Sequence, residues 1–157
     1  VMDLADLVSE QAIIPALAAD SKKQALHELA TKASELSGLP VPAREIFDTL
    51  LQRERLGSTG LGRGIAIPHV TFKHLDRIYC LFARLEKPSD FEALDDEPVD
   101  LIFLLLAPEH ASGDHLKALA RISRLLREPD VLKRLREATN PGEIFRVLTE
   151  PATPHAA

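Results

Sequence analysis

The chain has 157 residues, which is enough for one sizeable hydrophobic core, so we expect a single domain. Its 19 basic and 24 acidic side chains give a mildly acidic balance without a basic block, which argues against nucleic-acid binding as the main task. A single cysteine, Cys80, excludes an internal disulfide and is typical of a reducing compartment. No charged leader precedes an apolar core, and the longest apolar run, residues 101–107, is too short to cross a bilayer, so we expect a cytoplasmic protein that does not insert into membranes.

The first part of the chain predicts an edge strand and two helices. Residues 12–17 are apolar but contain a proline, which indicates a strand at the edge of a sheet. A helix capped by Asp20 or Ser21 follows, with leucine and alanine residues at helical spacing. A second helix has Pro42 in its first turn and runs to about Arg55.

Arg53 lies in the last turn of this second helix. It follows Leu50 by three residues and Ile46 by seven, so it shares their inward-facing stripe. Two interpretations stay open at this point. The guanidinium either complements the negative end of the helix or reaches into a site.

Residues 57–69 hold four of the seven glycines and end in Pro68 and His69. The pattern predicts a glycine-rich loop, a short strand at residues 65–67, and then a histidine behind a residue that fixes the backbone. The loop matches neither the Walker A pattern nor the dinucleotide-binding fingerprint, so nucleotide binding is not expected. A titratable imidazole after such a stiff segment is a candidate for chemistry.

Two apolar strands are predicted in the second half of the chain, at residues 78–85 and 99–106. In the first of these strands, the residues that point to either face of the sheet are apolar, which indicates a strand covered on both faces. Between them, an acidic segment predicts a short strand or a turn around Phe91.

Three further helices are predicted after these strands. Ser112 is expected to cap the first, and prolines start the other two, at residues 129–137 and 141–149. Residues 151–157 are predicted to be a frayed tail. Helices interspersed with apolar strands predict an α/β fold in which a mixed sheet is flanked by helices on both faces.

His115 is the second candidate residue. It lies in the first turn after Ser112, where free backbone amides favour anions, and on the same stripe as Leu119 and Ile122. Its ordinary interpretations are a hydrogen-bonded core histidine or a surface group near the helix cap. If the strands before His69 and His115 are neighbours, the two imidazoles meet in one cleft, with Arg53 close by.

Two histidines, an arginine and a helix amino end suit a transient phosphohistidine, because neutral imidazole is a nucleophile near pH 7. A metal site built from His69, His110 and His115 is the rival interpretation, but no pair has a compact zinc-binding spacing. A serine hydrolase is not expected, because the sequence has no Gly-x-Ser-x-Gly motif.

The stretch from Arg53 to His69 resembles the active-site signature of the enzyme IIA domains of the phosphoenolpyruvate-dependent phosphotransferase system. The resemblance is to the mannitol/fructose/nitrogen-regulatory class and is greatest to its nitrogen-regulatory member. It extends over residues 5–150, which we expect to form the IIA domain, and includes the start of the helix at His115. Members often have Asn where this chain has Arg63, and Gly where it has Val70.

The resemblance implies that His69 accepts a phosphoryl group from a small HPr-like carrier, that His115 supports the phosphorylated imidazole, and that Arg53 stabilises the phosphate. It implies no cofactor and no metal. The loop residues expected to support the phosphate are Gly57, Ser58, Thr59 and Gly60.

Three functions remain open. A nitrogen-regulatory IIA protein controls partners such as potassium transporters or sensor kinases according to its phosphorylation state. A sugar-specific IIA protein passes the phosphate to a IIB protein for fructose or mannitol uptake. A binding or metal-binding module without catalysis is the alternative of another class.

Overall fold

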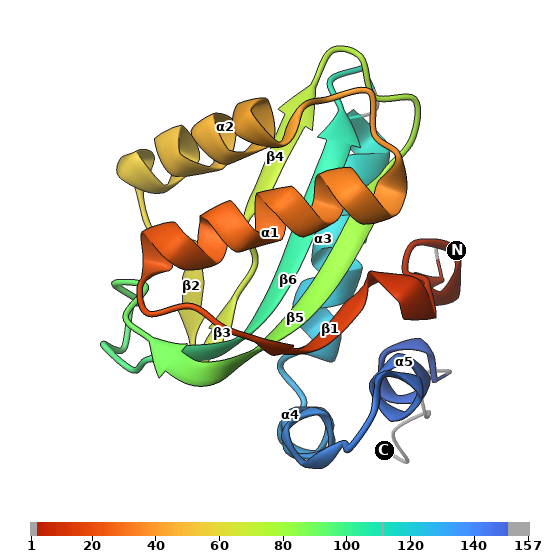
Figure 1. Cartoon of the computed structure of the whole chain (residues 1–157). Coiled ribbons are helices and arrows are strands. Elements are labelled where there is room, and N and C mark those ends of the chain that lie inside the picture. The colour runs from red at the N-terminus through yellow and green to blue at the C-terminus, as the bar shows by residue number, and fades with distance from the viewer. Residues whose placement is uncertain (1–2, 111, 151–157) are drawn as a thin grey trace.

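The computed structural model describes residues 3–110 and 112–150; the tail predicted at residues 151–157 lies outside them. The described residues form one six-stranded sheet with helices on both faces (Figure 1). In chain order the elements are the 3-10 helices η1 (Leu4–Asp6) and η2 (Glu10–Ala12), β1 (Ile13–Leu17), α1 (Lys22–Ser37), α2 (Ala43–Leu56), β2 (Gly60–Gly62), β3 (Ile65–Ala66), β4 (His69–Phe72), β5 (Tyr79–Ser89), β6 (Val99–Pro108), α3 (Ser112–Leu125), α4 (Pro129–Glu137) and α5 (Pro141–Thr149).

The sheet is mixed, as predicted. Its order is β1-β5-β6-β3-β2, and β4 also pairs with β6. Strands β5 and β6 are antiparallel, whereas β1 runs parallel to β5, and both β3 and β4 run parallel to β6. Strand β1 is therefore an edge strand, which explains why it tolerates a proline.

Strand β6 lies in the middle of the sheet and contributes to both hydrophobic cores. Ile102 and Leu104 pack into the core with α1 and α2, and Leu101 and Phe103 pack into the core with α3, α4 and α5. In Figure 1, α1 and α2 cover the near face of the sheet and α3 lies behind it. Burial on both faces explains the continuous apolar run of this strand. None of the helices in the described part of the chain has the length and apolar character that a membrane span requires.

The helix boundaries follow the predicted caps. The Ser21 hydroxyl accepts the amide of Gln24 at 3.1 Å, so Ser21 rather than Asp20 caps α1. Gly38 follows that helix in the left-handed conformation, and Pro42 precedes α2. Prolines are the first residues of α4 and α5, as the sequence predicts.

The glycine-rich stretch has more regular structure than predicted. Strands β2 and β3 form an antiparallel hairpin whose turn has positive φ angles at Arg63 (56°) and Gly64 (80°). The Asp95 carboxylate accepts the amide of Arg63 at 2.8 Å and thereby stabilises this unusual arginine backbone. The predicted strand at residues 65–67 ends as β3 at Ala66, and His69 begins a separate strand, β4.

The acidic segment after β5 forms a turn, which is one of the two predicted alternatives, and Phe91 in it is fully buried. The carboxylates of Asp90 and Asp95 accept nearby backbone amides there, and such local bonds compete with strand pairing. Ser112 is the first helical residue of α3, not the residue before the helix.

Candidate active site

His69 opens β4, where it pairs with Leu105 of the central strand β6. The carbonyl of Pro68 accepts the Leu105 amide at 2.9 Å, which anchors the backbone immediately before the histidine. The Nδ1 atom of His69 lies 2.7 Å from the carbonyl oxygen of Ile67. Because a carbonyl only accepts hydrogen bonds, Nδ1 carries the proton, and in the neutral ring Nε2 keeps its lone pair.

His115 lies in the first turn of α3 and faces His69. The two ring centroids are 5.8 Å apart, and the rings are tilted by 58°. The ring is half-buried as a whole, but its Nε2 atom is fully buried and has no hydrogen-bond partner among the described residues. A buried polar atom without a partner costs stability and calls for an explanation. A ligand that accepts or donates a hydrogen bond in this cleft would satisfy it.

The pKa of His115 is lowered below its usual value of 6.5, first by burial and second by the neighbouring His69. We therefore expect His115 to stay neutral at pH 7. The unfolded chain binds this proton at a higher pH than the folded chain does, so folding stability should fall as the pH drops through about 6.5. Thermal unfolding between about pH 7.5 and pH 5 should show a steeper loss for the wild type than for His115→Gln. An identical pH dependence in the two proteins would contradict this assignment.

Arg53 lies in the last turn of α2 and is half-buried. Its Nη1 atom donates to the carbonyl oxygen of Gly57 at 2.9 Å, so one donor of the guanidinium serves the helix end. Arg53 also lines a cleft of about 500 Å³ together with His69 and His115. The structure therefore brings together the three residues that the sequence singled out, from α2, β4 and α3. The cleft is completed by Thr49, Gln52, Leu56, Val70 and Thr71.

The four loop residues expected to support a phosphate do not line this cleft. The hydroxyl of Ser58 donates to the carbonyl oxygen of Phe91 and accepts the amide of Gly60. Thr59 is buried and contacts the Glu54 carboxylate. Only Gly57 connects directly to a cleft residue, through its bond from Arg53.

Arg63, a departure from the usual family pattern, points away from this cleft. Its guanidinium donates to the carbonyl oxygen of Arg127 at 2.8 Å, and its own carbonyl accepts Nη2 of Arg136 at 2.6 Å. These bonds tie the β2–β3 turn to the connection between α3 and α4 and to α4 itself. Val70, the other departure, is buried in the core with α1 and α2.

Glu54, a buried carboxylate next to the candidate arginine, is not among the site residues that the sequence predicts. Its position offered a signal, because it follows Leu50 by four residues and Ile46 by eight and so lies on the buried face of α2. The carboxylate accepts the amide of Thr59 at 3.1 Å and pairs with the Lys22 ammonium at 3.2 Å.

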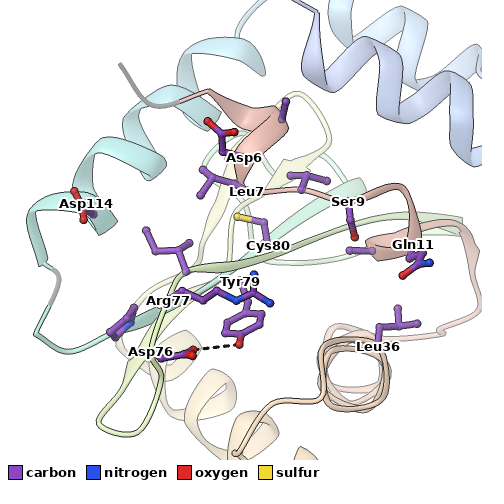
Figure 2. Close-up of a pocket in the computed structure, with 15 residues that line it drawn as sticks. Asp6, Leu7, Ser9, Gln11, Leu36, Asp76, Arg77, Tyr79, Cys80 and Asp114 are labelled. Carbon is purple, nitrogen blue, oxygen red and sulfur yellow. Dashed lines mark hydrogen bonds between the residues drawn. The ribbon is translucent and has the colours of Figure 1, made fainter.

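A larger cleft, of about 600 Å³, lies between the N-terminal segment, the start of β5 and the start of α3 (Figure 2). In it the Tyr79 hydroxyl donates to Asp76 at 3.2 Å, and the Arg77 guanidinium lies 4.6 Å from the Tyr79 ring centroid. Burial raises the pKa of the Cys80 thiol to about 12, so the thiol stays protonated and unreactive. These residues offer no nucleophile at neutral pH, and we place the candidate site at His69 despite its smaller cleft.

No group of three His, Cys, Asp or Glu side chains in residues 3–110 and 112–150 is placed to share a metal ion. His110, the third member of the metal set considered above, is exposed in the turn after β6.

The fold matches solved enzyme IIA structures. It superimposes on the nitrogen regulatory protein IIA-Ntr from Neisseria meningitidis with a TM-score of 0.87 and 31% identity, over 93% of this chain and 99% of that chain. With IIA mannitol from Escherichia coli the TM-score is 0.75 at 24% identity, over 90% of this chain and 98% of that chain, a likeness that concerns the fold alone. Fold and site together thus define a protein of the enzyme IIA class.

Sequence comparisons agree with this class. The nitrogen regulatory protein of Bradyrhizobium diazoefficiens is 56% identical over 150 residues, which cover 96% of this chain and 97% of that protein. Residues 6–150 match the family described as phosphoenolpyruvate-dependent sugar phosphotransferase system, EIIA 2. The chain belongs to this family, as the resemblance of its glycine-rich stretch predicted.

Proposed function

We propose that this protein is a cytoplasmic phosphocarrier with a regulatory role. In this proposal His69 accepts a phosphoryl group from a histidine of a small HPr-like carrier, and phosphorylation changes which proteins the chain binds. The family match over residues 6–150 and the 56% identity to a nitrogen regulatory protein support it. Potassium transporters and sensor kinases are the kinds of partner that we expect it to control.

The main support for the proposal is that His69, a nucleophile held in one orientation, lies beside His115, whose buried Nε2 has no hydrogen-bond partner among the described residues. His69 is held with Nδ1 on the Ile67 carbonyl, so the lone pair of Nε2 is the reactive one. The buried Nε2 of His115 lacks a partner, and the ring lies 5.8 Å from that of His69. In its neutral form, with the proton on Nε2, His115 would donate to a phosphoryl oxygen on His69.

The transfer step balances without a metal or a co-reactant from this chain. The Nε2 lone pair of His69 attacks the phosphorus of the donor phosphohistidine, and a new N–P bond forms as the donor's N–P bond breaks. The bond electrons return to the donor ring, which leaves as a neutral imidazole because its other ring nitrogen carries a proton. His69 keeps its own proton on Nδ1, against the Ile67 carbonyl, and becomes a phosphorylated imidazolium. Catalysis of such a transfer depends on positioning, which the Ile67 carbonyl supplies, and on charge stabilisation, which the Arg53 guanidinium supplies.

The test is phosphoryl transfer from phosphoenolpyruvate through enzyme I and an HPr-like carrier, followed by intact mass spectrometry. We expect one acid-labile phosphoryl group per chain. Failure with carriers from both the nitrogen and the sugar branches would refute phosphocarrier function and leave a binding module. Rapid onward transfer to a IIB protein would replace the regulatory role with the sugar-uptake alternative.

A further inference from the structure

Glu54 is the only buried carboxylate among the described residues, with an exposed fraction of 7%. It accepts the amide of Thr59 at 3.1 Å and a hydrogen bond from the Thr59 hydroxyl. On its other side it pairs with the Lys22 ammonium at 3.2 Å. Burying a carboxylate is costly unless it is paired and hydrogen-bonded, so this side chain is held in one place by three donors.

Hydrogen bonds through two intervening residues, Thr59 and Ile67, connect Glu54 to His69. The carbonyl oxygen of Thr59, whose amide and hydroxyl bind Glu54, accepts the amide of Ile67 at 3.1 Å. The carbonyl oxygen of Ile67 in turn lies 2.7 Å from Nδ1 of His69. The buried carboxylate therefore anchors Thr59, which in turn pairs with Ile67, the residue whose carbonyl selects the tautomer of the imidazole.

A second, shorter connection leads from Glu54 to Arg53. The backbone amide of Gly57 donates to the carbonyl oxygen of Glu54 at 3.2 Å, and the Gly57 carbonyl accepts Nη1 of Arg53 at 2.9 Å. Gly57 directly follows α2, two residues before Thr59, the residue that the Glu54 side chain binds. When Glu54 anchors Thr59, it also holds the nearby Gly57, whose carbonyl accepts the hydrogen bond from Arg53.

We propose that Glu54 is a positioning residue for phosphoryl acceptance, an inference that rests on the proposed function. It acts through Thr59 and Ile67 on the orientation and tautomer of His69, and through the 57–60 loop on Arg53. It does not touch the phosphoryl group, because it does not line the His69 cleft. The loop residues Ser58, Thr59 and Gly60 thus support the site through their hydrogen bonds outside the cleft rather than by binding phosphate.

The experiment compares Glu54→Gln with Glu45→Gln in the full chain. Both changes remove one negative charge from α2, but the side chain of Glu45 is exposed and belongs to no part of this network. In Glu54→Gln a neutral amide faces the Thr59 and Lys22 donors, which weakens every bond to the group. A second pair, Thr59→Val and Thr59→Ser, removes or keeps the hydroxyl and serves if Glu54→Gln does not fold.

Two readouts separate positioning from stability. Nitrogen NMR of His69 should show one tautomer, with the proton on Nδ1, in the wild type, in Glu45→Gln and in Thr59→Ser. We expect a mixture of tautomers in Glu54→Gln and Thr59→Val. With the phosphorylated HPr-like carrier as donor, kcat should fall roughly tenfold to hundredfold with little change in KM, because geometry rather than docking is lost.

An unchanged tautomer together with an unchanged kcat in folded Glu54→Gln and Thr59→Val would overturn the proposal. A change in melting temperature alone would also overturn it, because Glu54 would then be only structural. If the wild type accepts no phosphate but the tautomer still shifts in these variants, the proposed function fails while the control of His69 by Glu54 stands.

Discussion

His69→Ala is expected to abolish phosphoryl acceptance, with a loss of at least about a thousandfold in rate, because the only proposed nucleophile is removed. The fold should be retained, since the imidazole is only half-buried and, within residues 3–110 and 112–150, it hydrogen-bonds only to the local Ile67 carbonyl. Intact mass after incubation with the phosphorylated carrier measures the effect. Circular dichroism and the melting temperature check the fold.

The matched control is His74→Ala. His74 is exposed in the connection between β4 and β5 and lines neither the His69 cleft nor the larger one. We expect this variant to gain one phosphoryl group at the wild-type rate. A His69→Ala protein that still gained an acid-labile phosphoryl group, or a His74→Ala protein that lost it, would disprove the assignment of the acceptor.

Arg53→Ala is expected to slow phosphoryl acceptance by roughly tenfold to hundredfold. The guanidinium uses Nη1 on the Gly57 carbonyl, and none of its other donors has a partner within residues 3–110 and 112–150, so they remain for phosphoryl oxygens. The effect should be smaller than that of His69→Ala, because Arg53 is only half-buried and solvent screens part of its charge. Single-turnover transfer from the phosphorylated carrier measures this rate.

Two companion variants decide between the two interpretations of Arg53. Arg55→Ala removes an exposed cation from the same helix end and should leave the rate unchanged. Arg53→Lys keeps the charge but loses the planar, two-pronged donor, so it should restore only part of the rate. If Arg53→Ala lowered only the melting temperature, Arg53 would be a helix-end group and not a part of the site.

The sequence alone was sufficient for most of the local structure. Ser21, Gly38 and the prolines at the starts of α2, α4 and α5 act within one or two helical turns, so their effects can be read from neighbouring residues. The uninterrupted apolar run of β6 likewise predicted a strand buried on both faces. The mixed sheet with helices on both faces and the enzyme IIA family followed from these patterns and from the stretch that ends at His69, and both are confirmed.

Only the tertiary structure decided which side chains meet. His69, His115 and Arg53 are separated in the chain. They share a cleft because β4 pairs with β6 and because the first turn of α3 places His115 beside His69. The position of the 57–60 loop was decided in the same way: Thr59 bonds to Glu54, and Ser58 bonds to the Phe91 carbonyl, which lies beside it only after the chain has folded. The spacing of Glu54 from Leu50 and Ile46 indicated the buried face of α2, but hydrogen bonds leave no periodic signal, so its partners Thr59 and Lys22 were known only from the structure.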